Sequence, residues 1–200
     1  HRKLILPQLG APGVAAHEVK KRSGFWVEYG PVRTADLPEY LKTREATPEM
    51  RRVKSTLGNR LALVPVELSQ TILPMLAAAI VLYFMGGWIS SLAAVAAVLA
   101  GVALFPLLLP WLPTHNFSTK GFLLGGLVAL PFALSPFWRH PDWAWWWQAG
   151  QALEFLLAMP AATAFIALNF TGSTTFTSRS GVKREMFAYI PAMAWTFGIG

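Results

Sequence analysis

The strongest constraint on the fold is an apolar block that runs from residue 61 to residue 168. A hydrocarbon core about 30 Å thick requires roughly 20 mostly apolar residues for each helical crossing. Polar, Gly or Pro residues divide the block into four such lengths, and we predict transmembrane helices at 61–85, 88–112, 121–138 and 143–168. A fifth apolar run, 187–200, is too short to span, and we expect it to be cut off. The charged residues of the block are Glu67, Lys120, Arg139, Asp142 and Glu154.

Composition agrees with a membrane protein, since 54% of the residues are hydrophobic and only 14% are charged. Of the 17 Lys and Arg residues, 12 lie in the first 60 positions, together with six of the ten acidic residues. Basic residues before a first membrane helix are typical of cytoplasmic anchors, so we expect a lipid bilayer and no nucleic acid as partner. The chain has no cysteine, which excludes disulfides and cysteine-based metal sites within these residues.

The distribution of Lys and Arg predicts the orientation in the membrane. If the basic connector 51–60 is cytoplasmic, the loops at 113–120 and 169–185 are also inside and hold most of the remaining basic residues. The outside loops, at 86–87 and 139–142, then contain only Arg139 as a basic residue. We therefore predict a multi-pass protein of the cytoplasmic (inner) membrane with its amino-terminal domain in the cytosol. Interface-belt tryptophans are expected at the predicted helix ends, namely Trp88, Trp111, Trp138, Trp143, Trp145, Trp146 and Trp147.

Residues 1–50 read as alternating strands and helices. We predict a strand at 3–6, a helix at 14–23, a strand at 25–29, and a short helix from Thr34 or Asp36 to Leu41. This order is typical of a parallel, doubly wound sheet. Two strands cannot bury a core alone, so we expect further strands from upstream of His1 or from a partner. The predicted fold class is mixed: the end of an α/β (Rossmann-like) domain, followed by an α-helical transmembrane bundle at 61–200.

Two carboxylates fall inside predicted crossings, Glu67 and Glu154. Charges at membrane depth are costly and usually serve a function, and we expect Glu154 to be buried. Glu67 has a plain alternative as an interface residue that reaches lipid headgroups or Arg60. The segment 169–186, with seven Ser or Thr among its eighteen residues, fits either an ordered hydroxyl-rich loop or a solvated turn. A small-residue face suited to close helix packing comprises Ala93, Ala97 and Gly101.

Several runs of the chain resemble a known family. The runs in the soluble region are HRKLILPQLGAPGV (1–14), HEVKK (17–21), YGPVR (29–33) and ATPEMRR (46–52). They resemble the end of the corrinoid-binding domain of the large corrinoid iron–sulfur protein family. With a membrane domain that continues into NFTG (169–172) and SGVK (180–183), the chain is similar to the mercury-methylating corrinoid proteins of that family. The resemblance covers essentially all 200 residues.

The resemblance implies a methyltransferase that passes a methyl group from corrinoid cobalt to inorganic Hg(II), giving methylmercury. It also implies a methyl-tetrahydrofolate-dependent donor system and a ferredoxin-like iron–sulfur partner that returns the cobalt to its reduced state. The family motif Asn-(Val/Ile)-Trp-Cys-Ala-Ala-Gly-Lys, which supplies a cysteine to the cobalt, is absent from these residues. We therefore expect a fragment that is inactive alone, and we assign no catalytic and no metal-ligating residue within it.

The segment after the first predicted strand is the candidate corrinoid contact, because open α/β sheets bind ligands at the carboxyl ends of their strands. A plainer alternative is that its glycines only allow the chain to turn. A second function class stays open, a membrane transport or anchoring protein with a small α/β scaffold, which Glu67 and Glu154 would favour. The candidate contact residues are Gln8, Leu9, Gly10, Ala11 and Gly13.

Overall fold

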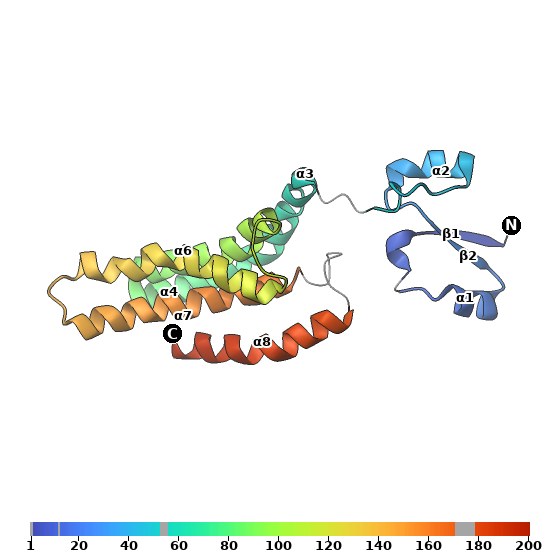
Figure 1. Cartoon of the computed structure of the whole chain (residues 1–200). Helices are drawn as coiled ribbons and strands as arrows, with labels where there is room; N and C mark the ends of the chain where they lie inside the picture. The colour runs from blue at the N-terminus through green and yellow to red at the C-terminus, as the bar shows by residue number, and fades with distance from the viewer. Residues whose placement is uncertain (1, 12, 53–55, 171–178) are drawn as a thin grey trace. The chain divides into compact units, whose positions relative to one another are not determined.

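The computed structural model describes residues 2–11, 13–52, 56–170 and 179–200. It is mostly helical, with one small sheet of two strands in the described part (Figure 1). The chain divides into two compact units, His1–Ser55 and Thr56–Gly200.

The first unit is built on a pair of parallel strands, β1 (Lys3–Pro7) and β2 (Trp26–Gly30). Helix α1 (Ala16–Ser23) connects the two strands and ends at Gly24, whose φ of 74° is the left-handed conformation that glycine adopts readily. The predicted order of strand, helix and strand is thus confirmed, as is the parallel pairing.

A second helix, α2 (Leu37–Thr43), follows β2 through the short turn η2 (Thr34–Asp36). Tyr40 of this helix is only 2% exposed and packs over Gly30 at the end of β2. A Cβ atom at position 30 would lie 3.3 Å from the Tyr40 ring and 3.0 Å from Ile5. Glycine at this position therefore lets α2 lie close to the sheet. The segment after α2 returns to the same strand end, where Val32 N donates a hydrogen bond to Met50 O at 2.9 Å.

The second unit contains three helical stretches long and apolar enough to cross a membrane, at Val64–Leu108, Phe117–Arg139 and Trp145–Leu168. The last two are helices α6 and α7, and they agree with the third and fourth predicted crossings, although α6 begins four residues before position 121. The first stretch follows the short helix α3 (Leu57–Leu61) and consists of α4 (Val64–Leu99), the π-helical turn η3 (Ala100–Leu104) and α5 (Phe105–Leu108).

The chain reverses direction inside the first stretch. A straight helix of this length would extend over roughly 65 Å. Its two ends nevertheless lie together, because α3 contacts α5 and Arg60 Nη1 donates a hydrogen bond to Leu107 O at 3.4 Å. Within α4 the non-helical residue is Gly87, with φ 81° and ψ −171°. The reversal therefore falls at the pair of glycines where the sequence predicts a loop.

Helices α6 and α7 lie side by side because glycines on α6 face backbone atoms of α7 (Figure 1). A Cβ atom at Gly121 would lie 2.5 Å from Ala164 Cα, and one at Gly125 would lie 2.6 Å from Pro160 Cα. No larger residue fits at either position without a shift of backbone. Close helix approach through small residues is the usual packing mode in membranes.

The predicted small-residue face at Ala93, Ala97 and Gly101 is confirmed, since all three residues are buried. A Cβ atom at Gly101 would lie 2.7 Å from Ile166 of α7. On the same contact Thr163 Oγ1 donates a hydrogen bond to Ala97 O at 3.0 Å. The face therefore joins the first stretch to α7.

Helix α8 (Arg179–Ile199) runs antiparallel to α7 and lies along it (Figure 1). Its far end reaches the middle of α7, because Gly200 lies against the backbone of Glu154. The helix begins eight residues before the fifth apolar run at Phe187. Residues 171–178, which include six of the seven Ser and Thr residues of the predicted hydroxyl-rich segment, lie outside the described residues.

Candidate functional site

The carboxyl ends of β1 and β2 lie at the same edge of the sheet, because the strands are parallel. The turn η1 (Gln8–Gly10) follows β1 directly at this edge. Gly13 N and Val14 N both donate hydrogen bonds to Gly10 O, at 3.0 and 3.1 Å. Tyr29, near the end of β2, donates its hydroxyl to Val14 O and ties the loop to the neighbouring strand. The described residues of this loop, 8–11 and 13–14, are therefore held at the edge where open α/β sheets bind ligands.

The structure brings all five predicted contact residues together in this loop. Leu9 is 55% exposed and Gly13 is exposed, while Gln8, Gly10 and Ala11 are half-buried. Neither Gly10 nor Gly13 has a positive φ, so the backbone does not require glycine at these positions. A Cβ atom at Gly10 would meet no other atom within 4 Å. The absent side chain thus leaves open space beside the loop.

This loop fits contact with the edge of a large ligand such as a corrinoid. Leu9 offers an exposed apolar side chain, Gln8 offers an amide, and Gly10 lets a bulky group come near the backbone. The loop provides no imidazole or thiolate for cobalt. Over the described residues, no group of three or more His, Cys, Asp or Glu is placed to hold a metal ion.

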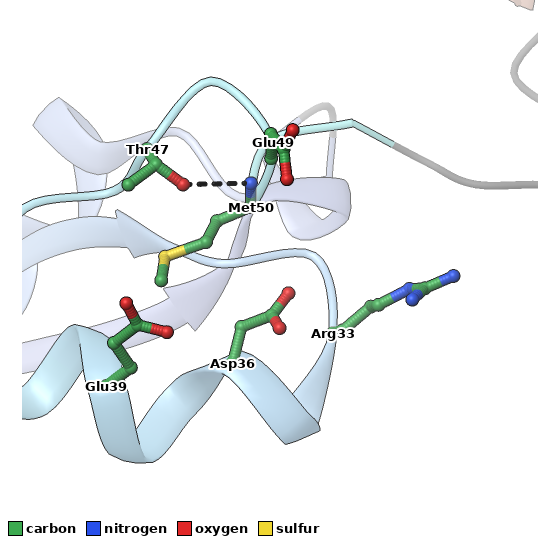
Figure 2. A pocket seen from close by; sticks show the side chains of 6 residues that line it. All are labelled: Arg33, Asp36, Glu39, Thr47, Glu49 and Met50. Atoms are coloured by element: carbon green, nitrogen blue, oxygen red, sulfur yellow. Dashed lines mark hydrogen bonds between the residues drawn. The ribbon is translucent and has the colours of Figure 1, made fainter.

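A separate hollow of about 330 Å³ lies beside the start of α2 (Figure 2). Asp36 and Glu39 line one side of it, and the Arg33 side chain points away from both acids (Figure 2). On the opposite side Met50 N donates a hydrogen bond to Thr47 Oγ1 at 3.3 Å. None of the predicted contact residues lines this hollow. The sequence did not indicate it, because its far wall comes from the segment that returns to β2 after α2.

A partly buried polar contact joins the two strands to α2. Glu28 on β2 pairs with Lys3 on β1, and Tyr40 Oη donates a hydrogen bond to Glu28 Oε1 at 2.5 Å. The hydrogen bond from Lys3, followed by that from Tyr40, lowers the pKa of Glu28. Burial, followed by the same hydrogen bond to Glu28, raises the pKa of Tyr40. This contact was missed because it depends on the strand register, which residue spacing does not give.

In the membrane unit, the expected burial of Glu154 is wrong for the single chain, because this residue lies on an exposed face of α7. Glu67 is half-buried in the first turn of α4, where a carboxylate suits the helix dipole. Among the described residues of this unit, the carboxylate that is buried is Glu185 on α8, which is 6% exposed and accepts a hydrogen bond from Ser118 N at 2.6 Å. It was missed because the sequence reading placed it in a loop.

No protein-family model matches this chain, and comparison with curated proteins and with solved structures finds no match either. The features that bear on function are therefore the loop after β1, the helices of membrane length, and the sequence runs that resemble the corrinoid family. The parallel strand pair and the membrane-length helices belong to one chain, and this combination restricts the function classes most strongly.

Proposed function

We propose that this chain belongs to a membrane-anchored, corrinoid-dependent methyltransferase of the HgcA type, which transfers a cobalt-bound methyl group to inorganic Hg(II) and forms methylmercury. The observation that supports this proposal is the loop after β1. It lies at the carboxyl edge of a parallel sheet, and it leaves open space at Gly10. The sequence runs that resemble the corrinoid family include this same loop.

The roles of the residues in this proposal are limited to binding and positioning. Gln8, Leu9, Gly10, Ala11 and Gly13 contact the edge of the corrinoid, which when bound supplies the methyl group on cobalt. Tyr29 holds the loop in place through its hydrogen bond to Val14 O. The 200 residues contain no cysteine, so none of them is assigned as the cobalt-ligating thiolate. A ferredoxin-like iron–sulfur protein of the HgcB type and a methyl-tetrahydrofolate-dependent donor complete the system.

The proposal includes four full crossings, with the amino-terminal unit in the cytosol and the chain in the cytoplasmic membrane. The reversal at Gly87 supports the division of the first apolar stretch into two antiparallel crossings. The excess of Lys and Arg in the first 60 residues supports the orientation.

The proposal is tested with the complete coding sequence, expressed with its iron–sulfur partner in an anaerobic host. Gly10→Phe places a ring in the open space beside the loop. We expect it to lower both corrinoid retention on the purified protein and methylmercury formation by at least about tenfold, the effect of losing about 1.4 kcal/mol of binding. The matched control is Lys42→Phe, which adds a ring on an exposed residue of α2 and should change neither.

Two results would contradict the proposal. Wild-type protein that forms no methylmercury in this system would exclude the activity, and normal corrinoid retention by Gly10→Phe would exclude the loop as the contact. Reading the coding sequence upstream of His1 is a direct complement. A cysteine within the family motif is expected there.

A transport or anchoring function is the second candidate. It is favoured by Glu154, an exposed carboxylate within a helix of membrane length, because such groups usually serve ion or substrate pathways. Glu154→Gln separates the two candidates. If methylmercury formation and Hg(II) uptake are both unchanged in this variant, the case for transport is removed.

A further inference from the structure

An apolar groove of about 360 Å³ lies between α7 and α8. Alanines form part of its lining, namely Ala161 and Ala162 from α7 and Ala194 from α8. Phe165 and Phe197 also line it and are 54% and 58% exposed. The lining residues are thus all apolar, and two of them are exposed aromatic rings.

The groove lies at membrane depth. Helix α7 is long and apolar enough to cross a bilayer, and α8 packs antiparallel along it, from buried Met193 to Gly200 beside Glu154. Within the hydrocarbon core no water covers such a surface, so an acyl chain or another helix must fill the groove.

The face of α8 that lines the groove also includes a basic residue, Lys183, nearer the start of the helix. Lys183, Phe187, Ile190, Ala194 and Phe197 are spaced by four, three, four and three residues, which places them on one helix face. Lys183 is exposed, and its Nζ atom lies 5.9 Å from the centroid of the Phe187 ring. Along the axis Lys183 lies roughly 10 Å before Ile190, while the headgroup layer is about 5–7 Å thick. With Ile190 in the hydrocarbon, Lys183 therefore reaches headgroup level.

The α7 side of the groove also ends in a polar residue. Ala162, Ile166 and Asn169 are spaced by four and three residues on α7, so that Asn169 lies on the groove side at the end of the helix. Asn169 is exposed, and its amide can donate a hydrogen bond. An apolar slot that ends at a cation and an amide is complementary to an anionic lipid, whereas a packed apolar helix would leave Lys183 without a counterpart.

We propose that this groove is a binding site for an anionic phospholipid, whose acyl chain lies between α7 and α8 and whose phosphate is bound by Lys183 with Asn169 beside it. Basic groups between membrane helices on the cytoplasmic side are known to attract anionic headgroups. The site is separate from the loop after β1 and does not depend on methyl transfer.

The test uses the full chain, purified in mild detergent, and measures retained lipid by native mass spectrometry with phosphatidylglycerol and phosphatidylcholine as probes. We expect about one phosphatidylglycerol per chain, held more tightly than phosphatidylcholine. Lys183→Gln should weaken phosphatidylglycerol binding about fivefold, the contribution of one basic residue near an anionic surface, and leave phosphatidylcholine unchanged. Ala194→Phe fills the groove and should abolish retention of both lipids.

Matched controls separate the site from general surface effects. Arg184→Gln removes the same charge one residue further around the helix, and Ala188→Phe adds the same ring at an exposed position outside the groove lining. Neither control should change lipid retention. An equal loss with Arg184→Gln would overturn the proposal in favour of general charge attraction. Full retention by Ala194→Phe, or a lipid-free dimer that this variant disrupts, would also overturn it.

Discussion

At the scale of single residues, Glu28 links three elements of the amino-terminal unit. Its carboxylate pairs with Lys3 and accepts a hydrogen bond from Tyr40, so β1, β2 and α2 all depend on its charge. The hydrogen bond from Lys3 keeps the pKa of Glu28 below its usual value. A depressed pKa stabilises the folded unit above the unfolded pKa of about 4.3, and this stabilisation is lost as the pH falls through the folded pKa.

We therefore predict that Glu28→Gln loosens the sheet at neutral pH and removes its acid sensitivity. The loss of a hydrogen-bonded charge should cost about 1.5–3 kcal/mol. Amide hydrogen exchange of Trp26–Gly30, corrected for the intrinsic exchange rate at each pH, measures the effect. In the wild type, protection should fall below about pH 4, whereas in the variant it should be lower at pH 7 and nearly constant with pH.

The control for this prediction is Glu18→Gln. Glu18 pairs with Arg22 on the exposed side of α1, and surface pairs of this kind contribute little. If the two variants show the same exchange at β2, Glu28 has no special role in the sheet.

Tyr40 limits the stability of the same contact at high pH. Burial and the hydrogen bond to Glu28 raise the pKa of Tyr40. The contribution of Tyr40 to the stability of the folded unit is therefore complete below the unfolded pKa of about 10. It is lost as the pH rises through the folded pKa. We predict that protection of β2 amides declines above about pH 10 in the wild type. The Tyr40→Phe variant has no hydroxyl to ionise at this position. Protection of its β2 amides should be lower at pH 7 but should not decline at high pH. An identical alkaline decline in both proteins would contradict the assignment.

Glu185 has the corresponding structural role in the membrane unit. Its carboxylate accepts a hydrogen bond from Ser118 N in the first turn of α6, where the helix dipole favours a negative charge. We predict that Glu185→Ala lowers the free energy of opening of α8 by about 2 kcal/mol. Glu185→Gln should lower it by about half as much, because glutamine retains an acceptor but no charge. Hydrogen exchange of α8 amides measures both, with exposed Glu154→Gln as control. Unchanged exchange in Glu185→Ala would show that the contact does not hold α8.

These residues show which part of a site the sequence predicts. The position of Gln8 to Gly13 after a strand followed from local pattern, because the loop is continuous in the chain. The pairs Lys3–Glu28 and Ser118–Glu185 did not, since they join residues 25 and 67 positions apart in the sequence. Such contacts depend on strand register and helix packing, and hydropathy patterns contain neither.

At the scale of helices, hydropathy predicted α6 and α7 well because their length is set by the bilayer. The start of α8 was missed for a physical reason. Lys183, Arg184 and Glu185 interrupt the apolar pattern, yet all three are good helix formers, and the helix extends through them to Arg179. Apolarity predicts where a helix enters the membrane, and intrinsic propensity together with packing decides where it begins.

The contact between α6 and α7 gives a prediction at this scale. A Cβ atom at Gly121 would lie 2.5 Å from a backbone atom of α7, so Gly121→Ala forces the two helices apart. Overpacking of this kind typically costs about 1–3 kcal/mol. Thermal unfolding in detergent should show a clear loss of stability for this variant.

The control lies on the same helix. Gly126→Ala adds the same methyl group where nothing lies within 4 Å, so it should be neutral or slightly stabilising through better helix propensity. Equal stability of the Gly121→Ala and Gly126→Ala variants would contradict the close contact.

At the scale of the whole molecule, the number of crossings decides on which side of the membrane each loop lies. If the stretch from Val64 to Leu108 crosses twice, Glu45 and His115 lie on the same side. If it crosses once, they lie on opposite sides. The chain has no cysteine, so single cysteines can be introduced without background labelling. Glu45, Met85, His115 and Asp142 are all exposed and suit this purpose.

We predict that an impermeant maleimide applied to intact cells labels Met85→Cys and Asp142→Cys but not Glu45→Cys or His115→Cys. The last two should react only after the membrane is permeabilised. The reason is the reversal at Gly87, which places Met85 at the outer turn of a helical hairpin whose ends meet through Arg60 and Leu107. Labelling of His115→Cys from outside, with Glu45→Cys still protected, would require a single crossing and would move the loop between α6 and α7 to the cytosolic side.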